Sequence, residues 1–231
     1  MLMGPQNLPE NIRQVRERIK RAAVECGRNV DSVTLLAVCK SQPPEIVRAA
    51  ARAGLEHFGE SYLQEALGKI AALTDLALTW HFVGRVQANK TREIAAHFSW
   101  VHGVDRLRIA ERLAAQRPFH APPLNVCLQV KMGAEESKGG VAPSDVRALA
   151  AQVAKLPRLR LRGLMCVPPP ATTAAEQRRP FAKLATLLQE LNAAGAQLDT
   201  LSMGMSADFE AAICEGATLV RVGTALFGAR S

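Results

Sequence analysis

The sequence predicts an α/β fold, a single (β/α)8 TIM barrel with an extra N-terminal helix. Eight short β-type runs alternate with helical segments almost to the end of the 231 residues. An amphipathic helical segment precedes the first run. No linker, low-complexity stretch or change in composition divides the chain, so residues 1–231 are expected to form one domain.

The eight predicted strands are short apolar runs bounded by turn residues. An open doubly wound sheet would usually have fewer strands and a glycine-rich first loop, but the loop after the first strand is KSQPP. Eight strands with seven helices between them is the count of a closed barrel. The strands are predicted at 33–39, 55–58, 78–83, 100–103, 124–130, 159–167, 200–203 and 218–222.

The helix predicted before the first strand covers 8–26 and stops at Gly27. The apolar stripe that we expect it to bury consists of Leu8, Ile12, Val15, Ile19, Ala22 and Ala23. Later start and stop signals are Pro43-Pro44 with Gly54, Pro143-Ser144-Asp145, and Ser206-Ala207-Asp208 with Gly216.

The composition is that of an ordinary globular protein, with 48% hydrophobic and 22% charged residues. No apolar run approaches the ~20 residues of a membrane span, and no signal peptide is evident, so we expect a cytoplasmic protein that does not bind membranes. The formal net charge of +8 suits anionic ligands. The basic residues of the first helix are interpreted as a solvated face rather than an RNA-binding surface, and nucleic acid is not expected as a partner.

The cysteine and histidine spacings argue against a disulfide-rich secreted protein and against a zinc protein. The five cysteines form no C-x-x-C pair, and three lie in strand-like runs, which favours reduced thiols in a cytoplasmic protein over a disulfide framework. The five histidines have no zinc-type spacing, so no metal site is expected.

Two features at opposite ends of the chain point to one binding site. Lys40 directly follows the most apolar predicted strand, while the turn Ser202–Ser206 and the pair Gly223-Thr224 follow strands seven and eight. In (β/α)8 barrels sites lie at the carboxyl ends of the strands, and phosphate is commonly held after strands seven and eight. Strands one and eight are neighbours in a closed barrel, so these groups can converge.

The chemistry of these groups indicates pyridoxal 5'-phosphate (PLP). A partly desolvated lysine favours the nucleophilic amine that attacks an aldehyde, and small residues on two loops bring backbone N–H groups to a phosphate. Each residue also has a simpler interpretation. Lys40 alone would fit a solvated loop lysine, Ser206 a helix N-cap, and Arg221 either a structural ion pair or a contact to polar groups of the cofactor.

Long motifs across nearly the whole chain resemble the pyridoxal phosphate homeostasis protein family, which is similar to the barrel domain of alanine racemase. The motifs are LLAVCK, HFGESYLQE, HFVGRVQANK, ESKGG, LRGLM, LSMGMSADFEAAI and RVGTALFGAR. The resemblance implies a protein that holds PLP covalently at Lys40 as an internal aldimine, binds its phosphate, and supplies it to apo-enzymes. We expect the protein to be a monomer. The cofactor-binding residues that follow from the motifs are Lys40, Ser61, Tyr62, Asn89, Met165, Ser202, Ser206, Arg221, Gly223 and Thr224.

Three positions depart from the family's usual pattern. Ser61 replaces an asparagine near the cofactor, which shortens a hydrogen-bonding arm, and Lys131 and Gly103 replace an asparagine and a serine. Asn89 and Lys138 are the polar loop residues that we expect to matter most on the rim.

A carrier is favoured over an enzyme. A PLP racemase needs acid–base groups on both faces of the cofactor, and one is usually a tyrosine from a second domain. This chain ends eight residues after Gly223, and its single tyrosine, Tyr62, follows the second strand. The alternatives are a racemase-like PLP enzyme, a class I aldolase-like barrel whose Lys40 attacks a substrate carbonyl, and an RNA- or partner-binding module.

Overall fold

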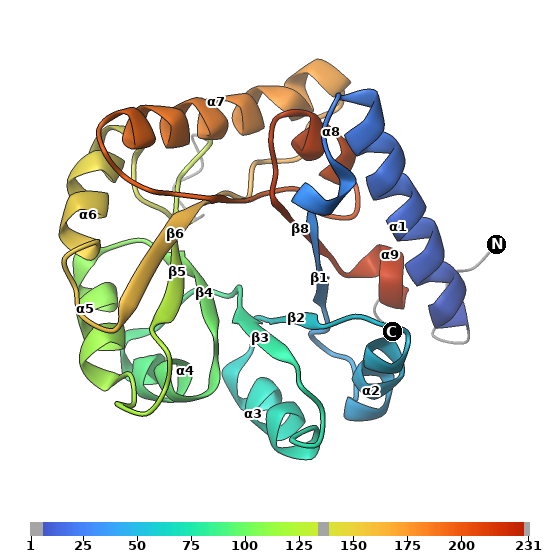
Figure 1. Ribbon diagram of the computed structural model, residues 1–231, viewed down its shortest axis with the longest axis horizontal. Helices are drawn as coiled ribbons and strands as arrows, with labels where there is room; N and C mark the ends of the chain where they lie inside the picture. The colour runs from blue at the N-terminus through green and yellow to red at the C-terminus, as the bar shows by residue number, and fades with distance from the viewer. Residues whose placement is uncertain (1–6, 134–138, 229–231) are drawn as a thin grey trace.

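The computed structural model describes residues 7–133 and 139–228 and contains a closed barrel of eight parallel strands (Figure 1). Each strand pairs with the next in chain order, and β1 closes the barrel against β8. The predicted fold class is confirmed, and all eight strands occur within two residues of their predicted ends. The strands are β1 (Thr34–Val38), β2 (His57–Glu60), β3 (Thr79–Phe82), β4 (Trp100–Val104), β5 (Leu124–Gln129), β6 (Leu159–Met165), β7 (Thr200–Ser202) and β8 (Leu219–Val222).

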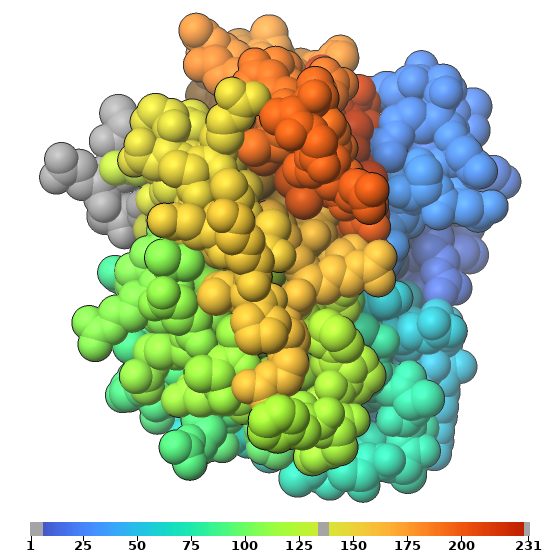
Figure 2. All heavy atoms as spheres, turned by 60° about the vertical axis from the view of Figure 1, so that its left-hand side comes forward, coloured from blue at the N-terminus to red at the C-terminus, as the bar shows by residue number. Residues whose placement is uncertain are grey.

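Helices surround the barrel, and α1 is the extra one that precedes the first strand (Figure 1). Figure 2 shows part of this outer layer, with α5, α6 and α7 in green, yellow and orange. The helices are α1 (Leu8–Glu25), α2 (Pro44–Arg52), α3 (Leu63–Ala72), α4 (Thr91–His97), α5 (Leu107–Gln116), α6 (Val146–Val153), α7 (Ala174–Ala193), α8 (Phe209–Cys214) and α9 (Thr224–Phe227). Short 3-10 turns are η2 (Val30–Ser32), η3 (Ala88–Lys90) and η4 (Pro143–Asp145).

Helix α1 buries the apolar stripe that the sequence predicts and packs against α8 and α9. Its basic side chains largely bind the protein itself. Arg18 forms an ion pair with Glu210 at 2.7 Å, Arg16 donates to the carbonyl of Gly54, and Arg13 pairs with Glu10. The face predicted to be solvated therefore also makes intramolecular contacts through three of its arginines.

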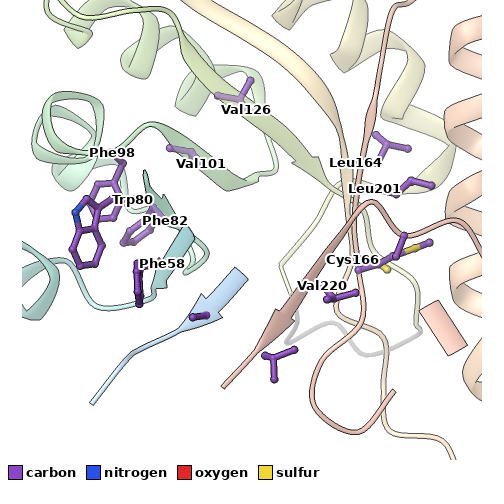
Figure 3. Close-up of a cluster of buried hydrophobic side chains, with 14 of the residues drawn as sticks. Phe58, Trp80, Phe82, Phe98, Val101, Val126, Leu164, Cys166, Leu201 and Val220 are labelled. Carbon is purple, nitrogen blue, oxygen red and sulfur yellow. The ribbon is translucent and has the colours of Figure 1, made fainter. Parts of the chain in front are cut away.

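Buried side chains of the strands and helices form the core (Figure 3). Phe58, Trp80, Phe82 and Phe98 gather on one side of this cluster, where the Phe82 and Phe98 rings meet edge to face with centroids 5.3 Å apart. Phe181, Phe209 and Phe227 are also buried in the core, and the rest of it is mostly aliphatic, as expected for a chain with 4% aromatic residues.

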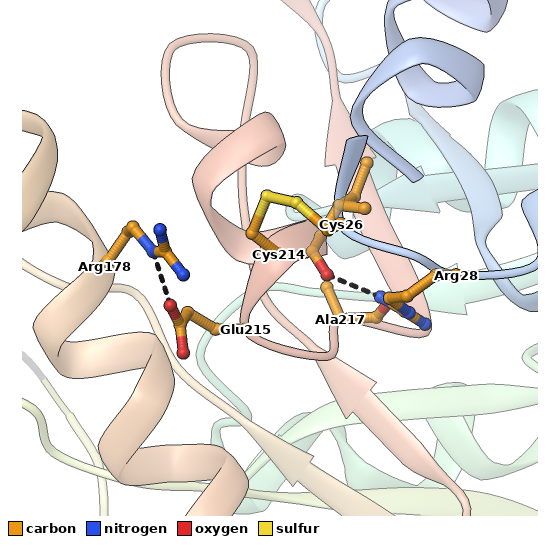
Figure 4. Close-up of a disulfide and its surroundings, with 7 residues drawn as sticks. Cys26, Arg28, Arg178, Cys214, Glu215 and Ala217 are labelled. Carbon is orange, nitrogen blue, oxygen red and sulfur yellow. Dashed lines mark hydrogen bonds and ion pairs between the residues drawn. A yellow bond between two sulfur atoms is a disulfide. The ribbon is translucent and has the colours of Figure 1, made fainter. Parts of the chain in front are cut away.

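A disulfide between Cys26 and Cys214 joins the end of α1 to α8 (Figure 4). The expectation that all cysteines are reduced is therefore wrong for this pair. Their separation of 188 residues carries no sequence signal, but the packing of α1 on α8 brings their Cα atoms within 5.2 Å. Cys39, Cys127 and Cys166 are buried free thiols, as predicted for strand cysteines.

Within residues 7–133 and 139–228, no helix combines the length and the apolar character needed to cross a membrane.

Candidate cofactor-binding site

Lys40 occupies the second position of a tight turn just after β1. The N–H of Gln42 donates to the carbonyl oxygen of Cys39 at 3.1 Å and closes the turn around Lys40 and Ser41. Lys40 is half-buried, and Ser41 has a φ of 64°, in the left-handed region that glycine or asparagine usually occupies. The lysine therefore stands at the carboxyl-terminal rim of the barrel, where (β/α)8 sites lie.

The loop after β8 lies beside this turn. Ala37 pairs with Val222, which places Gly223 next to Val38. A side chain on Gly223 would approach the Val38 carbonyl oxygen to 3.2 Å, so the two backbones run close together here. Thr224, the first residue of α9, is exposed on the rim. Two of the predicted groups, the lysine and the Gly223-Thr224 turn, are thus on neighbouring loops.

The loop after β7 is joined to the start of α9 by Ser206. Its Oγ accepts a hydrogen bond from the backbone N–H of Ala225 at 3.2 Å, which leaves the hydroxyl proton for another acceptor. Gly204 has a φ of 90°, and a Cβ there would lie 2.6 Å from that of Ala212. Only glycine therefore lets this turn pack onto α8. The hydrogen bond between Ser206 and Ala225 joins the two predicted phosphate loops.

The interpretation of Ser206 as the N-cap of the next helix is wrong. Helix α8 begins at Phe209, and Asp208 occupies the N-cap position. Asp208 Oδ1 accepts a hydrogen bond from the Met205 N–H at 2.6 Å, so the aspartate closes the turn. The serine lies outside the helix, with its hydroxyl turned to the neighbouring loop instead.

Arg221 extends a buried guanidinium from β8 to the ends of β6 and β7. It donates to the carbonyl oxygen and the Oγ of Ser202 at 2.6 and 2.9 Å, and to the carbonyl oxygen of Cys166 at 2.8 Å. All three acceptors are neutral, namely two carbonyl oxygens and one hydroxyl. Burial lowers the pKa of this arginine. Since a guanidinium has five N–H donors, two remain for another acceptor.

Three histidines, of which His81 and His102 are buried and His57 is half-buried, continue this network across the barrel, and the sequence analysis did not find them. His102 Nδ1 lies 2.8 Å from Ser202 Oγ, His81 Nδ1 lies 3.0 Å from His102 Nε2, and His57 Nδ1 lies 3.0 Å from His81 Nε2. Burial, with the Arg221 charge, lowers the pKa of His102 to about 3, and burial lowers that of His81 well below its usual value. The signal that could have shown them is one histidine in each of three consecutive strands.

Ser61 and Tyr62 lie on a second part of the rim, after β2. Both line a cavity of about 460 Å³, together with Gly84 and Lys90 from the segment after β3. Tyr62 is 56% exposed, and Asn89 is exposed in η3. The structure brings Ser61 and Tyr62 together, but within residues 7–133 and 139–228 no hydrogen bond links Ser61, Tyr62 or Asn89 to the Arg221 network.

The departure at Gly103 has a structural counterpart. A Cβ at this position of β4 would lie 2.6 Å from the carbonyl oxygen of Gly84, so the backbone after β3 fills the space of the missing side chain.

Met165 is buried at the end of β6, where it pairs with Ser202. Lys131 is half-buried after β5, and Lys138 lies outside the described residues.

In the part of the chain that the structure describes, no group of three or more histidine, cysteine and acidic side chains is arranged to hold a metal ion. The strand thiols are poor nucleophiles, because burial raises the pKa of Cys127 and of Cys166 to about 12.

Comparison with known proteins identifies the family of this chain. The family model described as "Alanine racemase, N-terminal domain" matches residues 5–231. A "Pyridoxal phosphate homeostasis protein" from Pseudomonas aeruginosa is 60% identical over 223 residues, 96% of each chain. The chain belongs to the pyridoxal phosphate homeostasis protein family. Another member, from Escherichia coli K12, is 47% identical over 227 residues, 97% of each chain.

Solved structures of similar proteins have the same fold. PipY from Synechococcus elongatus without PLP has a TM-score of 0.85 and 42% identity, covering 96% of this chain and all of that one. PipY with PLP bound has a TM-score of 0.81 and 43% identity, covering 91% of this chain and all of that one. Alanine racemase from Corynebacterium glutamicum, at 15% identity and a TM-score of 0.71, shows likeness of fold; 99% of this chain matches 63% of it.

The residues on the rim fit PLP as a chemical group. The buried guanidinium of Arg221 has unused donors for a ring nitrogen or oxygen, and Ser206 and Thr224 carry hydroxyls on the joined loops that follow strands β7 and β8. Lys40 supplies the amine from the adjacent strand. One rim of the barrel therefore carries both an amine suited to an aldehyde and two loops suited to a phosphate.

Proposed function

We propose that this protein binds PLP at the carboxyl-terminal rim of the barrel and acts in PLP homeostasis as a carrier that supplies the cofactor to apo-enzymes. The observation that carries the proposal is the convergence of three neighbouring strands. Strand β1 leads to Lys40, while the loops after β7 and β8 are joined by the hydrogen bond from Ala225 to Ser206. The relatives named for PLP homeostasis and the PLP-bound PipY support the same cofactor.

Each residue has a role in this proposal. The amine of Lys40 holds the cofactor covalently through its aldehyde, which is the chemistry that PLP supplies. Ser202, Ser206, Gly223 and Thr224 belong to the two loops that bind the phosphate. Arg221 donates to a polar group of the ring, and Ser202 and the Cys166 carbonyl fix its direction. Met165 packs beside Ser202 under the site.

Ser61, Tyr62 and Asn89 form the outer part of the site in this proposal. The short Ser61 side chain reaches less far than an asparagine would, and Gly84 packs tightly against the Ser61 backbone. A Cβ on Gly84 would lie 2.4 Å from the Ser61 carbonyl oxygen, so the segments after β2 and β3 touch here. We therefore expect this side of the cofactor to be held more loosely than its phosphate.

A carrier is proposed rather than a catalyst, because holding PLP needs an amine and a phosphate clamp while turnover also needs a positioned base. The only tyrosine of the chain is more than half exposed on the rim. We also propose that the protein is cytoplasmic and monomeric, and that apo-enzymes which use PLP are its partners.

The test is an absorption spectrum of the purified protein before and after borohydride, with peptide mapping of the adduct. A yellow protein that borohydride bleaches, with a pyridoxyl group on Lys40, is the expected result. A colourless protein that borohydride traps only with a sugar phosphate would overturn the proposal in favour of an aldolase-like reaction.

A further inference from the structure

Lys69 places a buried ammonium group directly behind the turn that carries Lys40. The residue belongs to α3, and its side chain is 3% exposed. Its Nζ donates to the carbonyl oxygen of Cys39 at 2.7 Å, to Glu60 Oε1 at 2.6 Å, and to Glu65 Oε1. An ammonium has three N–H donors, so these contacts use all of them. Lys69 is therefore occupied with the protein itself.

Glu65 extends the same cluster to the other side of Lys40. Its Oε1, which accepts from Lys69, also accepts the backbone N–H of Ser41 at 2.5 Å. The Cys39 carbonyl belongs to the peptide group before Lys40, and the Ser41 N–H belongs to the peptide group after it. One lysine–glutamate pair thus holds both peptide groups that flank Lys40.

These two peptide groups fix the backbone angles of Lys40 and hence the direction in which its side chain leaves the rim. The turn needs such support, because Ser41 adopts a left-handed conformation that a residue with a Cβ rarely takes. Gln42 contributes one further hydrogen bond, to the same Cys39 carbonyl. The conformation is thus held mainly from α3, outside the turn.

The charges of the cluster suit a rigid support. Burial alone would lower the pKa of Lys69, but the hydrogen bonds to Glu60 and Glu65 raise it above its usual value, so the ammonium stays charged. Glu60 is fully buried at the end of β2, and its Oε1 also accepts from the Cys39 thiol at 3.2 Å. A buried group with all its donors satisfied has few alternative positions.

We propose that Lys69 is a positioning residue for Lys40, and that Glu65 is its partner in holding the turn. The inference rests on the proposed function, in which Lys40 forms the covalent link to PLP. Lys69 itself does not touch the cofactor in this proposal. It sets the angle at which the Lys40 amine meets the aldehyde, whereas the phosphate is held by the loops after β7 and β8.

The test uses two ligands that differ only at the reacting carbon, PLP and pyridoxine 5'-phosphate, which carries an alcohol in place of the aldehyde. Lys69→Met keeps most of the buried stem and removes the donors. We expect it to bind PLP at least tenfold more weakly and to lose most of the borohydride-trapped adduct at Lys40. Its affinity for pyridoxine 5'-phosphate should stay within twofold of wild type.

Two further variants separate positioning from general damage. Glu65→Gln keeps an oxygen acceptor for Ser41 and should retain most PLP binding, while Glu65→Ala should resemble Lys69→Met. Arg48→Met is the matched control, because it breaks an ion pair with Asp75 between α2 and the end of α3 that does not touch the turn. It should bind both ligands as wild type does.

Hydrogen exchange of the apo-protein gives a readout that needs no cofactor. In Lys69→Met and Glu65→Ala the amides of 39–42 should exchange faster while the barrel strands keep their protection. Normal PLP affinity and trapping in both variants would overturn the inference, as would equal weakening of both ligands. Absence of a Lys40 adduct in the wild type would instead overturn the proposed function, and it is visible before any variant is made.

Discussion

The Nδ1 atom of His102 lies 2.8 Å from the Oγ of Ser202, which also accepts a hydrogen bond from Arg221. A neutral imidazole has one donor and one acceptor nitrogen. His102, His81 and His57 form a row of hydrogen-bonded rings. Each contact between two rings has one donor and one acceptor only if all three protons are on Nδ1 or all three are on Nε2. An extra proton on His81 or His102 would set two N–H groups against each other. The buried arginine is therefore connected to a set of histidines that must stay neutral.

This arrangement predicts a loss of stability in mild acid. His102 has a folded pKa of about 3, below the unfolded value near 6.5. Between these values the unfolded chain binds a proton that the folded protein does not, so the free energy of unfolding falls as the pH falls below 6.5. One such histidine costs about 1.4 kcal/mol per pH unit. Above pH 7 it should have no effect.

Urea denaturation of the apo-protein at pH 7, 6 and 5 measures this effect, with His102→Asn as the comparison. This window lies above the ordinary pKa of most carboxyl groups, and contributions such as the raised pKa of Glu60 cancel in the difference. Between pH 7 and pH 5 the wild type should lose about 2 kcal/mol more stability than the variant, with most of the loss below pH 6. Parallel curves would contradict the prediction.

The sequence predicted the barrel well because its signals are local. Alternating apolar runs and proline or glycine boundaries identify strands and helices one at a time, and the closing pair β1–β8 follows from the count. The disulfide between Cys26 and Cys214 and the histidine chain could not be predicted in this way. They depend on which side chains face each other across the fold. For the same reason the sequence wrongly predicts Ser206 as a helix N-cap, although its Oγ accepts a hydrogen bond from the N–H of Ala225 on the next loop.

Replacing Lys40 by alanine should abolish the covalent adduct and leave the fold intact. The side chain is half-buried at the rim and does not belong to the packed core. Some PLP should still bind through its phosphate. Borohydride reduction with peptide mapping, and thermal melting followed by circular dichroism, test the two parts. A wild-type adduct found mainly on Lys90, Lys131 or Lys138 would show that another lysine forms the link.

Combining Ser206→Ala with Thr224→Val should weaken PLP and leave pyridoxal nearly unchanged. The lost hydroxyls serve a phosphate that only PLP carries, and hydrogen bonds to charged groups contribute about 1.5–3 kcal/mol each. The dissociation constant of PLP should therefore rise about a hundredfold or more. Thr186→Val is a suitable control, because this exposed threonine lies on α7 and its hydroxyl donates to the Ala182 carbonyl of the same helix. Equal weakening of both ligands would place the phosphate elsewhere.

The holo-protein should restore activity to an apo-enzyme that uses PLP, and the Lys40→Ala variant should do so less well at equal total PLP. A carrier delivers cofactor from a defined site, so delivery should follow the amount of protein-bound PLP. The measurement is the recovered activity of the apo-enzyme after mixing, compared with free PLP at the same concentration. Recovery that is identical with free PLP, holo-protein and variant would contradict delivery from the Lys40 site.

The protein should show no substantial racemase, transaminase or decarboxylase turnover with common amino acids. Covalent binding of PLP requires only the Lys40 amine and the two joined loops, whereas turnover requires a base that controls the substrate's Cα–H bond. Tyr62 is the only tyrosine, and its 56% exposure leaves it without the fixed position that proton transfer needs. The buried His81 and His102 cannot serve in its place, because each hydrogen-bonds through both ring nitrogens within the barrel. Assays of amino-acid disappearance and of stereochemical inversion with the PLP-loaded protein measure this directly. Steady turnover near 1 per second or faster, lost in Lys40→Ala, would show that the barrel is an enzyme, since ordinary enzymes turn over at about this rate or above it.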